Sequence, residues 1–352
     1  MNKNPNNVTR KYFAAANSYN GFVSLFDRIF KSQDFNRIYV LKGGPGTGKS
    51  SFMKRISAEL ISKKCNVDEI YCSSDPYSLD GIIATHGVNK IAIIDGTSPH
   101  ERDAVIPGAI DEIVNLGYGW NDKWLVSKRD KICKIAQEKK KAYKTAYSYL
   151  KIAGTADEYI HYEYSSIFDK RKAKSKAEEI LSSISLDEES ERFTFFISSF
   201  GKYGKYKIKE DQTFLGRIIY VGGNEYATDL FMENLMNTSL SKGLSPNIIK
   251  SPLDQTYPEG MCFGNSSIAI LKSDIYDIHS NEFLLDDKIC IERTRKASEI
   301  KKDALEESQR WFSIASEMHF ELEEIYGASM DFSKIDGIFT QKMIEIENIL
   351  KI

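Results

Sequence analysis

The sequence predicts an α/β fold in which a parallel sheet is flanked by helices, and in which this arrangement occurs twice along the chain. Three observations predict it. A short apolar run, a glycine-rich loop and an amphipathic segment follow one another between Arg37 and Ile61. A second apolar run, from Lys90 to Thr97, ends in an acidic residue, and a weaker copy of the first pattern begins at Arg217. Strands that alternate with helical segments are typical of sheets with parallel strands.

The glycine-rich stretch GGPGTGKSS at 43–51 carries the strongest chemical signal in the chain. Gly43 is followed after four residues by Gly48, Lys49 and Ser50, which is the phosphate-binding P-loop pattern. Glycines let consecutive backbone N–H groups point at phosphate oxygens, the lysine reaches the β- and γ-phosphates, and the hydroxyl can bind Mg²⁺. The predicted nucleotide-binding residues are Gly43, Gly44, Pro45, Gly46, Thr47, Gly48, Lys49, Ser50 and Ser51.

The residues on either side of the loop have the periodicities that the motif requires. Residues 38–41 form an apolar run that indicates a buried strand, and apolar residues recur at helical spacing from Phe52 to Ile61. A chance glycine turn lacks this context. The order strand, loop, helix directs the N-terminus of the helix at the phosphates.

The stretch VDEIYC at 67–72 predicts a second strand, and the segment after it lies where ligands bind in such folds. Asp75 or Asp80 could orient a water molecule or a phosphoryl acceptor there. The alternative, which we favour, is that Asp75 caps a helix beginning at Pro76, because Asp is a common N-cap residue.

The stretch KIAIIDGT at 90–97 predicts a third strand that ends in Asp95. This matches the Walker B form, in which the acid holds hydrated Mg²⁺ across from the P-loop hydroxyl. We therefore predict that Ser50 and Asp95 hold the metal. Gly96 follows Asp95, so the adjacent catalytic glutamate of many ATPases is missing.

The segment after Asp95 offers candidates for sensing the γ-phosphate or orienting water: His100, Glu101 and Asp103. We select His100, because histidine is easily recruited near neutral pH, and predict Lys49, Asp95 and His100 as catalytic residues. The alternative is that Ser98 and Glu101 form a helix-capping box. The stretch PGAIDEIVNLG at 107–117 predicts a short amphipathic helix closed by glycine.

A long helical hairpin is expected at about 121–185, with its turn at Gly154-Thr155. Its first arm is rich in lysine. The arm could be a lid over the nucleotide, a contact for a protein partner or a contact for nucleic acid. A solvated hairpin is the simplest interpretation, because charged helix faces usually face water.

The second half of the chain is a degenerate copy of the first. When Gly222-Gly223 is set on Gly43-Gly44, Phe231-Met232 falls on Phe52-Met53 without a gap. Ala227, Thr228 and Asp229 then replace the Gly-Lys-Ser of the phosphate loop, so a carboxylate stands where phosphate would bind. We expect domains at 1–190 and 191–352, a second hairpin at about 286–352 with a break near Gly327, and no nucleotide in the second half.

Composition limits the classes of partner. The net charge of −2 gives no general attraction to nucleic acid or to an acidic membrane surface, although nucleic acid stays an alternative for the basic arm. The five cysteines show no C-x-x-C pair, which favours a reducing cytoplasm. Neither a signal-peptide core nor an apolar run of membrane length is present, and residues 1–10 are polar and expected to fray.

The chain resembles a family of duplicated P-loop ATPase-like proteins of bacteria, mostly spore-forming Firmicutes. The resemblance lies in GGPGTGKSS at 43–51, CSSDPYSLDG at 72–81, DGTSPH at 95–100 and PGAIDEIVNLG at 107–117. It implies ATP and Mg²⁺ as ligands and a hydrolase that couples ATP hydrolysis to a conformational change or to a protein partner of the hairpins. Two alternatives remain: a small-molecule or nucleotide kinase, and a nucleotide-gated scaffold with little turnover.

Overall fold

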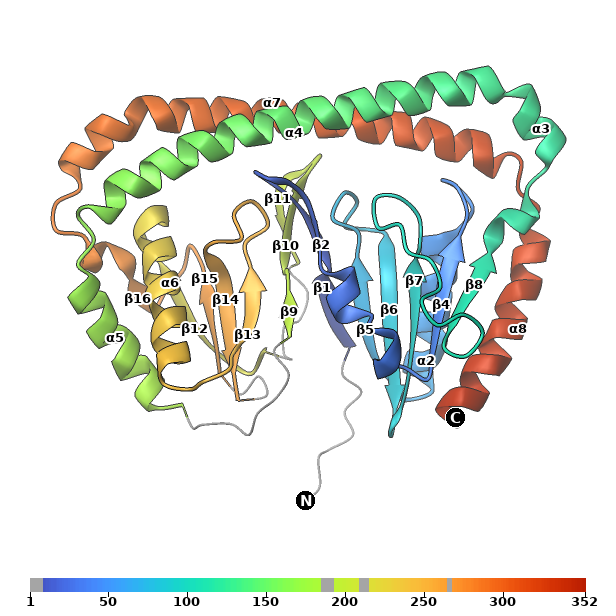
Figure 1. The fold of residues 1–352 in the computed structure, drawn as a ribbon, viewed down its shortest axis with the longest axis horizontal. Helices are drawn as coiled ribbons and strands as arrows, with labels where there is room; N and C mark the ends of the chain where they lie inside the picture. The colour runs from blue at the N-terminus through green and yellow to red at the C-terminus, as the bar shows by residue number, and fades with distance from the viewer. Residues whose placement is uncertain (1–8, 185–192, 209–214, 265–267) are drawn as a thin grey trace. The chain divides into compact units, whose positions relative to one another are not determined.

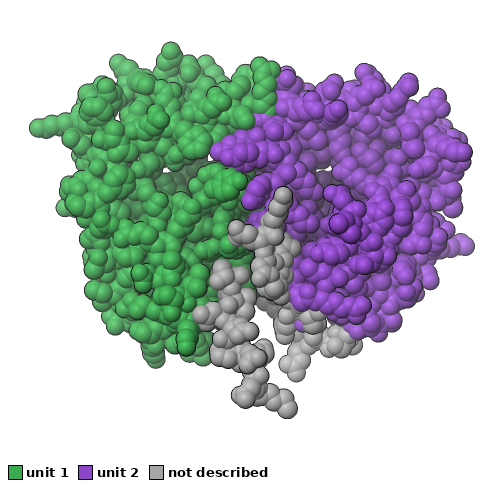
Figure 2. All heavy atoms as spheres, turned by 180° about the vertical axis from the view of Figure 1, so that it is seen from behind, with its two compact units in different colours: residues 1–15, 24–145, 310–352 green, residues 16–23, 146–309 purple. Residues whose placement is uncertain are grey.

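The computed structural model describes residues 9–184, 193–208, 215–264 and 268–352 (Figure 1). The chain divides into two compact units, which Figure 2 colours separately. Unit 1 holds residues 1–15, 24–145 and 310–352, and unit 2 holds residues 16–23 and 146–309. The expected domain boundary near residue 190 and most of the N-terminal stretch expected to fray lie outside the described residues. Each unit takes segments from both expected halves.

Unit 1 contains a six-stranded sheet. In spatial order its strands are β1 (Thr9–Phe13), β5 (Asn66–Tyr71), β6 (Leu79–His86), β7 (Asn89–Asp95), β4 (Arg37–Lys42) and β8 (Asp111–Asn115). Strand β4 pairs in parallel with β7 and β8, and β1 pairs in parallel with β5. Strand β6 is antiparallel to both of its neighbours, so the expectation of a fully parallel sheet is wrong. The cause is the tight turn at Gly87 (φ +60°), because a connection this short can join only antiparallel strands.

Two helices cover one face of this sheet, α2 (Lys49–Ser62) and α8 (Phe332–Leu350). The buried side of α2 includes Phe52, Ile56 and Leu60, as its helical spacing predicts. The rings of Phe52 and of Phe339 in α8 are almost perpendicular, with their centroids 5.8 Å apart. The strand–loop–helix unit predicted from the sequence is confirmed, and α8 completes its core.

Three predictions of helix in unit 1 are wrong. Residues 111–115 form β8, followed by the 3₁₀ turn η2 (Leu116–Gly119), because pairing with β4 overrides the amphipathic pattern. Asp75 starts a turn rather than a helix: its backbone oxygen accepts a hydrogen bond from Ser78 N at 2.9 Å, and β6 begins one residue later. The segment from Ser98 to Glu101 has no helix after it, so the capping-box interpretation also fails.

Unit 2 contains a second six-stranded sheet. In spatial order its strands are β9 (Thr194–Phe195), β13 (Asn247–Lys250), β14 (Pro258–Phe263), β15 (Ile268–Lys272), β12 (Arg217–Gly222) and β16 (Ile278–His279). Along this order, each pair of neighbouring strands has the same relative direction, parallel or antiparallel, as the pair at the same place in the unit 1 sheet. Helices α5 (Lys170–Ser182) and α6 (Glu225–Ser241) share a hydrophobic core with this sheet. The two sheets therefore have one topology, and both are mixed.

The two longest helices are α4 (Arg129–Ser165) and α7 (Lys288–Gly327). The turn expected at Gly154 is wrong, because α4 continues through it. A side chain at this position would meet the Tyr19 ring at about 2.7 Å, so close packing accounts for the glycine. The bend comes later, where Asp169 accepts hydrogen bonds from the backbone N–H groups of Arg171 and Lys172 and caps α5. The break near Gly327 is confirmed.

Short elements complete the described chain. They are β2 (Ala15–Ser18), β3 (Gly21–Ser24), α1 (Phe26–Ile29), η1 (Ser32–Asp34), α3 (Asp122–Ser127), β10 (Ser198–Gly201), β11 (Gly204–Lys207) and η4 (Ser280–Phe283). None of the helices in the described ranges has the length and apolar character needed to cross a bilayer.

Candidate nucleotide-binding site

The glycine-rich loop lies between β4 and α2. Residues 43–48 form the loop, and Lys49, Ser50 and Ser51 form the first turn of the helix. Gly46 and Gly48 have φ values of +69° and +83°, which only glycine adopts without strain. No side chain caps the N-terminus of α2, so its first N–H groups point out of the helix in the way that anion-binding helix starts require.

Lys49 spans the loop. Its Nζ donates hydrogen bonds to the backbone oxygens of Gly43 at 3.0 Å and of Gly44 at 2.9 Å. The same Nζ lies 3.7 Å from Oδ2 of Asp95, and the side chain is 12% exposed. The loop thus holds a largely buried cation against its own glycines, facing the acidic end of β7.

Asp95 is oriented by its neighbours. The register of β4 and β7 places it beside Leu41, one strand away from the loop. Its Oδ1 accepts hydrogen bonds from the backbone N–H and the hydroxyl of Thr97, at 2.9 and 2.6 Å. Burial raises the pKa of Asp95, and nearby Lys49 opposes that rise. The other oxygen, Oδ2, is the one that faces Lys49.

The predicted metal ligands fit Mg²⁺ by their chemistry. The Ser50 hydroxyl accepts a hydrogen bond from Leu79 N at 3.0 Å, which fixes its position at the start of α2. Asp95 contributes a carboxylate from the end of β7. Mg²⁺ prefers oxygen ligands and usually takes only one or two from protein side chains, completing its shell with water and phosphate oxygens.

His100 joins this group through Asp80. The His100 ring is buried, stacks on Phe26 at 4.4 Å between centroids and places Nε2 2.8 Å from Oδ2 of Asp80. Gly81 pairs with Ile94 across β6 and β7, so Asp80 lies beside Asp95, and its charge adds to the raised pKa of Asp95. The structure therefore brings Lys49 and Asp95 together, places Ser50 next to Lys49 in the first turn of α2, and connects His100 to Asp95 through Asp80.

Residues from the end of α7 to the start of α8 pack directly on the loop. A β-carbon on Gly46 would lie 2.4 Å from the backbone oxygen of Glu323, and one on Gly44 would lie 3.3 Å from the Tyr326 ring. A β-carbon on Gly48 would lie 3.5 Å from Phe332. The sequence analysis did not identify these neighbours of the phosphate loop. They lie almost 280 residues further along the chain, and no local pattern indicates such a contact.

Lys139 of α4 brings a second cation to the site. Its Nζ is 3.4 Å from Nδ1 of His319. Burial lowers the pKa of Lys139, the charge of Glu323 raises it, and the charge of Lys49 lowers it further. The lysine-rich arm noted in the sequence therefore carries one lysine within electrostatic reach of the phosphate loop.

The described residues of the second half that align with the phosphate loop, 222–227, do not form such a loop. Asn224 directly follows the turn at Gly223 and caps α6, its side-chain oxygen accepting hydrogen bonds from the N–H groups of Tyr226 and Ala227 at 3.0 and 3.1 Å. Residues that align with the loop thus form the first turn of a helix. Their N–H groups serve the cap instead of an anion.

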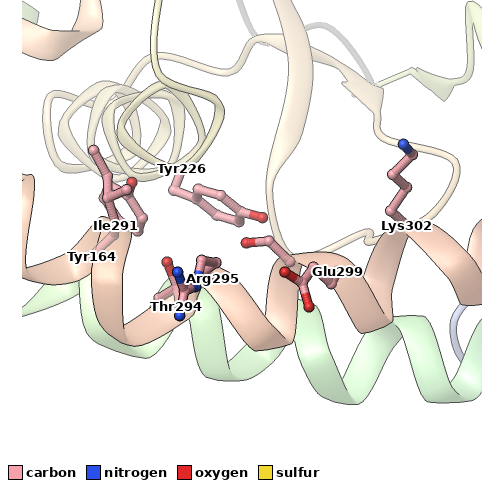
Figure 3. A pocket seen from close by; sticks show the side chains of 8 residues that line it. Tyr164, Tyr226, Ile291, Thr294, Arg295, Glu299 and Lys302 are labelled. Carbon is pink, nitrogen blue, oxygen red and sulfur yellow. The ribbon is translucent and has the colours of Figure 1, made fainter.

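A cavity of about 400 Å³ lies beside this first turn (Figure 3). Tyr226 and Tyr164 line one side, with ring centroids 5.0 Å apart. The other side is formed by polar residues of α7: Thr294, Arg295, Ser298, Glu299 and Lys302. Because acidic and basic side chains are mixed here, the cavity lacks the concentrated positive charge that a triphosphate needs.

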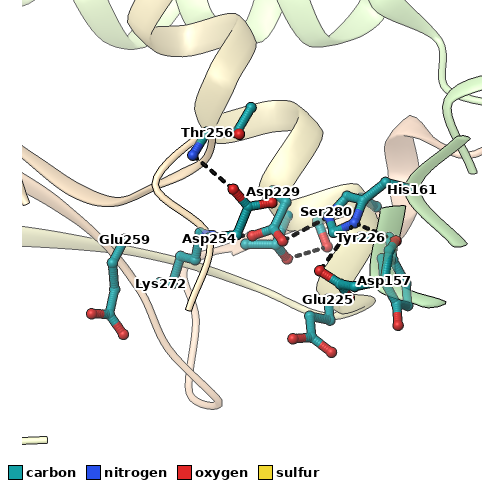
Figure 4. Close-up of polar contacts among 12 residues, drawn as sticks. Asp157, His161, Glu225, Tyr226, Asp229, Asp254, Thr256, Glu259, Lys272 and Ser280 are labelled. Carbon is teal, nitrogen blue, oxygen red and sulfur yellow. Dashed lines mark hydrogen bonds and ion pairs between the residues drawn. The ribbon is translucent and has the colours of Figure 1, made fainter. Parts of the chain in front are cut away.

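An internal ion network takes the place of the phosphate chemistry in unit 2 (Figure 4). Asp229 of α6 accepts hydrogen bonds from Lys272, at the end of β15, and from Nε2 of His161 at 3.0 Å. Burial would raise the pKa of Asp229, but Lys272 and His161 outweigh it and bring it to about 2. The ion pair between helix start and strand end is thus present in both units with the signs exchanged: Lys49 with Asp95, and Asp229 with Lys272.

Comparison of the chain with protein-family models, with curated proteins and with solved structures finds no match.

Proposed function

We propose that the chain is a Mg²⁺-dependent ATPase with one nucleotide site, in unit 1. The observation that carries the proposal is the position of Lys49, which bonds two backbone oxygens of a glycine-rich loop and faces Asp95 at 3.7 Å. A cation held in this way offsets the charge of the β- and γ-phosphates, while the uncapped start of α2 supplies N–H donors.

In this proposal each side chain has one role. Lys49 binds the phosphates, Ser50 and Asp95 hold Mg²⁺, and Thr97 keeps the Asp95 carboxylate in position through two hydrogen bonds. The metal, when bound, neutralises charge that develops on the phosphate oxygens. His100 is a positioning residue, because it acts through its hydrogen bond to Asp80.

The contacts of the loop support coupling of ATP binding to movement of the helices. Gly46 packs against the backbone of Glu323, and Gly44 packs against Tyr326. A phosphate chain that enters the loop changes what these residues of α7 contact. This is how nucleotide state can reach a protein partner of the long helices.

A nucleotide-gated scaffold with little turnover is the second candidate. A β-carbon at Gly96 would lie 2.4 Å from the Val40 side chain and 2.9 Å from the Arg102 backbone oxygen. The position after Asp95 therefore has no room for the glutamate that many ATPases use there, which favours slow hydrolysis.

All five cysteines are unpaired thiols, which supports the cytoplasm as the compartment.

Binding and turnover of MgATP test the proposal in three variants. Lys49→Ala is expected to weaken binding about 100-fold or more, since charge-assisted hydrogen bonds contribute about 1.5–3 kcal/mol each. Asp95→Asn is expected to lower Mg²⁺-dependent phosphate release at least about tenfold while ATP binding measured without Mg²⁺ is unchanged. Lys63→Ala, at the far end of α2, is the control and should behave as wild type.

The outcomes separate the candidate functions. Unchanged affinity of Lys49→Ala in calorimetry would remove the site assignment. Binding without phosphate release would favour the scaffold. Transfer of phosphate to an added acceptor instead of water would indicate a kinase.

A further inference from the structure

A polar cavity of about 710 Å³ lies next to the phosphate loop within unit 1. One wall is the segment after β8, from Gly119 to Trp124, and the other is the connection from Ala328 to Asp331 with Lys334 of α8. The two walls are joined at Asn121, whose N–H donates to the backbone oxygen of Ser329 at 2.9 Å. No residue of this cavity belongs to the predicted phosphate or metal site.

The cavity is on the correct side of the loop for the distal part of a nucleotide. Strand β4, which leads into the loop, has β7 on one side and β8 on the other. Asp95, which we propose to hold Mg²⁺, ends β7, so a bound metal and γ-phosphate would lie toward that strand. The segment that follows β8 lies across the loop from Asp95, so a nucleotide whose γ-phosphate lies at Asp95 would extend its ribose and base toward this segment.

Trp120 connects the cavity with the loop. Its Cζ2 atom would lie 3.4 Å from a β-carbon on Gly44, and its ring is 5.7 Å from the Tyr326 ring, tilted by 48°. The opposite edge of the indole, Cε3 and Cζ3, packs on Gly117. The edge that carries Nε1 is therefore the one turned toward the phosphate loop, because Nε1 and Cζ2 are bonded to the same ring carbon.

The indole N–H of Trp120 is buried and has no hydrogen-bond partner among the residues that the structure describes. Leaving a buried donor without an acceptor costs about 1–3 kcal/mol, so an acceptor atom supplied by a ligand would stabilise this group. The neighbouring Trp124 differs, since its Nε1 donates to the backbone oxygen of Ile325 at 3.4 Å. The N–H of Trp120 can therefore gain an acceptor from a ligand, whereas the N–H of Trp124 already has one.

We propose that this cavity binds the base of the nucleotide, a purine, with the Trp120 N–H donating to an acceptor atom of the base. Trp120 supplies aromatic surface for a flat ring, and the polar walls suit a base with hydrogen-bonding edges. The inference rests on the proposed function, because it assumes that the triphosphate occupies the loop at Lys49.

The test compares MgATP with inorganic tripolyphosphate plus Mg²⁺, which has the phosphates and no base. Trp120→Phe keeps an aromatic ring at this position and removes the N–H. It is expected to weaken MgATP binding about threefold to tenfold, the factor for one hydrogen bond, and to leave tripolyphosphate binding unchanged. Trp311→Phe, in α7 and outside the lining of this cavity, is the matched control and should leave the ratio of the two affinities at its wild-type value.

Several results would overturn the inference. These are an unchanged MgATP affinity in Trp120→Phe, an equal loss for both ligands, or a wild-type chain that binds MgATP no more tightly than tripolyphosphate. Emission of Trp120, in a chain with Trp124→Phe and Trp311→Phe, should change with MgATP and not with tripolyphosphate. Failure of the proposed function looks different: Lys49→Ala would then leave the affinities for both ligands intact.

Discussion

Lys49 and Asp229 show how single side chains decide whether the start of a helix can hold phosphate. Lys49 is a cation whose partners are two backbone oxygens and one carboxylate at 3.7 Å, so it can rearrange to bind an anion. Asp229 is an anion that Lys272 and His161 already satisfy, and its pKa of about 2 keeps it charged at neutral pH. A triphosphate would be repelled there, because the network has no spare positive charge to offer.

His161 makes the stability of unit 2 depend on pH. Burial lowers its pKa, but the hydrogen bond and the charge of Asp229, together with Asp157, raise it above the ordinary histidine value of about 6.5. A raised folded-state pKa adds stability that is fully present below pH 6.5 and is lost as pH rises through the folded value. His161→Gln should therefore destabilise the protein most below pH 6.5, and less in alkaline buffer.

Urea unfolding of the wild type and of His161→Gln at a series of pH values measures how the loss of unfolding free energy depends on pH. The other titratable groups of the network are Asp157, Glu225, Tyr226, Asp229, Tyr257, Lys272 and Lys301. These groups are the same in the wild type and in the variant, so their direct contributions to the pH dependence of the unfolding free energy largely cancel. A destabilisation by His161→Gln that stays constant from acidic to alkaline pH would contradict the assignment of His161 as a cation.

At the scale of elements, one strand–connection–helix unit occurs in two forms. In unit 1 a six-residue loop, 43–48, separates β4 from α2 and exposes uncapped N–H groups. In unit 2 the connection from β12 is only Gly223 and Asn224, and α6 begins one turn earlier relative to the aligned phenylalanine and methionine. The turn added to the helix removes the anion site and gives α6 a side-chain cap.

The cap predicts a structural role for Asn224. Asn224→Ala should lower the free energy of unfolding by about 1 kcal/mol, because it leaves the N–H groups of Tyr226 and Ala227 without their acceptor. The affinity for MgATP should not change. Asn237→Ala, at an exposed position in the same helix, is the control and should have a smaller effect. A loss of nucleotide binding in Asn224→Ala would show that α6 belongs to the nucleotide site.

At the scale of the whole molecule, two sheets of one topology carry one set of phosphate-binding groups. The strand directions agree at every position, but loop, lysine and strand-end carboxylate occur together only in unit 1 among the described residues. Unit 2 retains the fold and has a filled ionic core. This division supports a chain in which one unit binds nucleotide and the other serves packing or a partner.

Stoichiometry follows from that division. Titration with a slowly hydrolysed ATP analogue should saturate at about one equivalent per chain, and the same analogue should raise the unfolding temperature through unit 1. In Lys49→Ala both effects should disappear. A second equivalent that persists in Lys49→Ala and is lost on changing residues 222–230 would show that unit 2 also binds nucleotide.

The sequence by itself determined the strand β4, the loop, the helix α2, the strands β5 and β7, and the helix break at Gly327. These elements depend on local periodicity and on residue spacing, which are visible in the sequence without any knowledge of tertiary contacts. The approach of Lys49 to Asp95 was also predictable, because parallel neighbouring strands end at the same edge of a sheet.

Tertiary structure decided the rest. Residues 111–115 have an amphipathic pattern compatible with a helix, and pairing with β4 makes them a strand. Gly154 lies inside α4 because Tyr19 packs against it, and Gly46 is required by the backbone of Glu323 as well as by its own positive φ. The links from His100 to Asp80 and from Trp120 to Gly44 join segments with no shared local signal. Only packing brings such segments together, since side chains distant in sequence meet through burial and strand register.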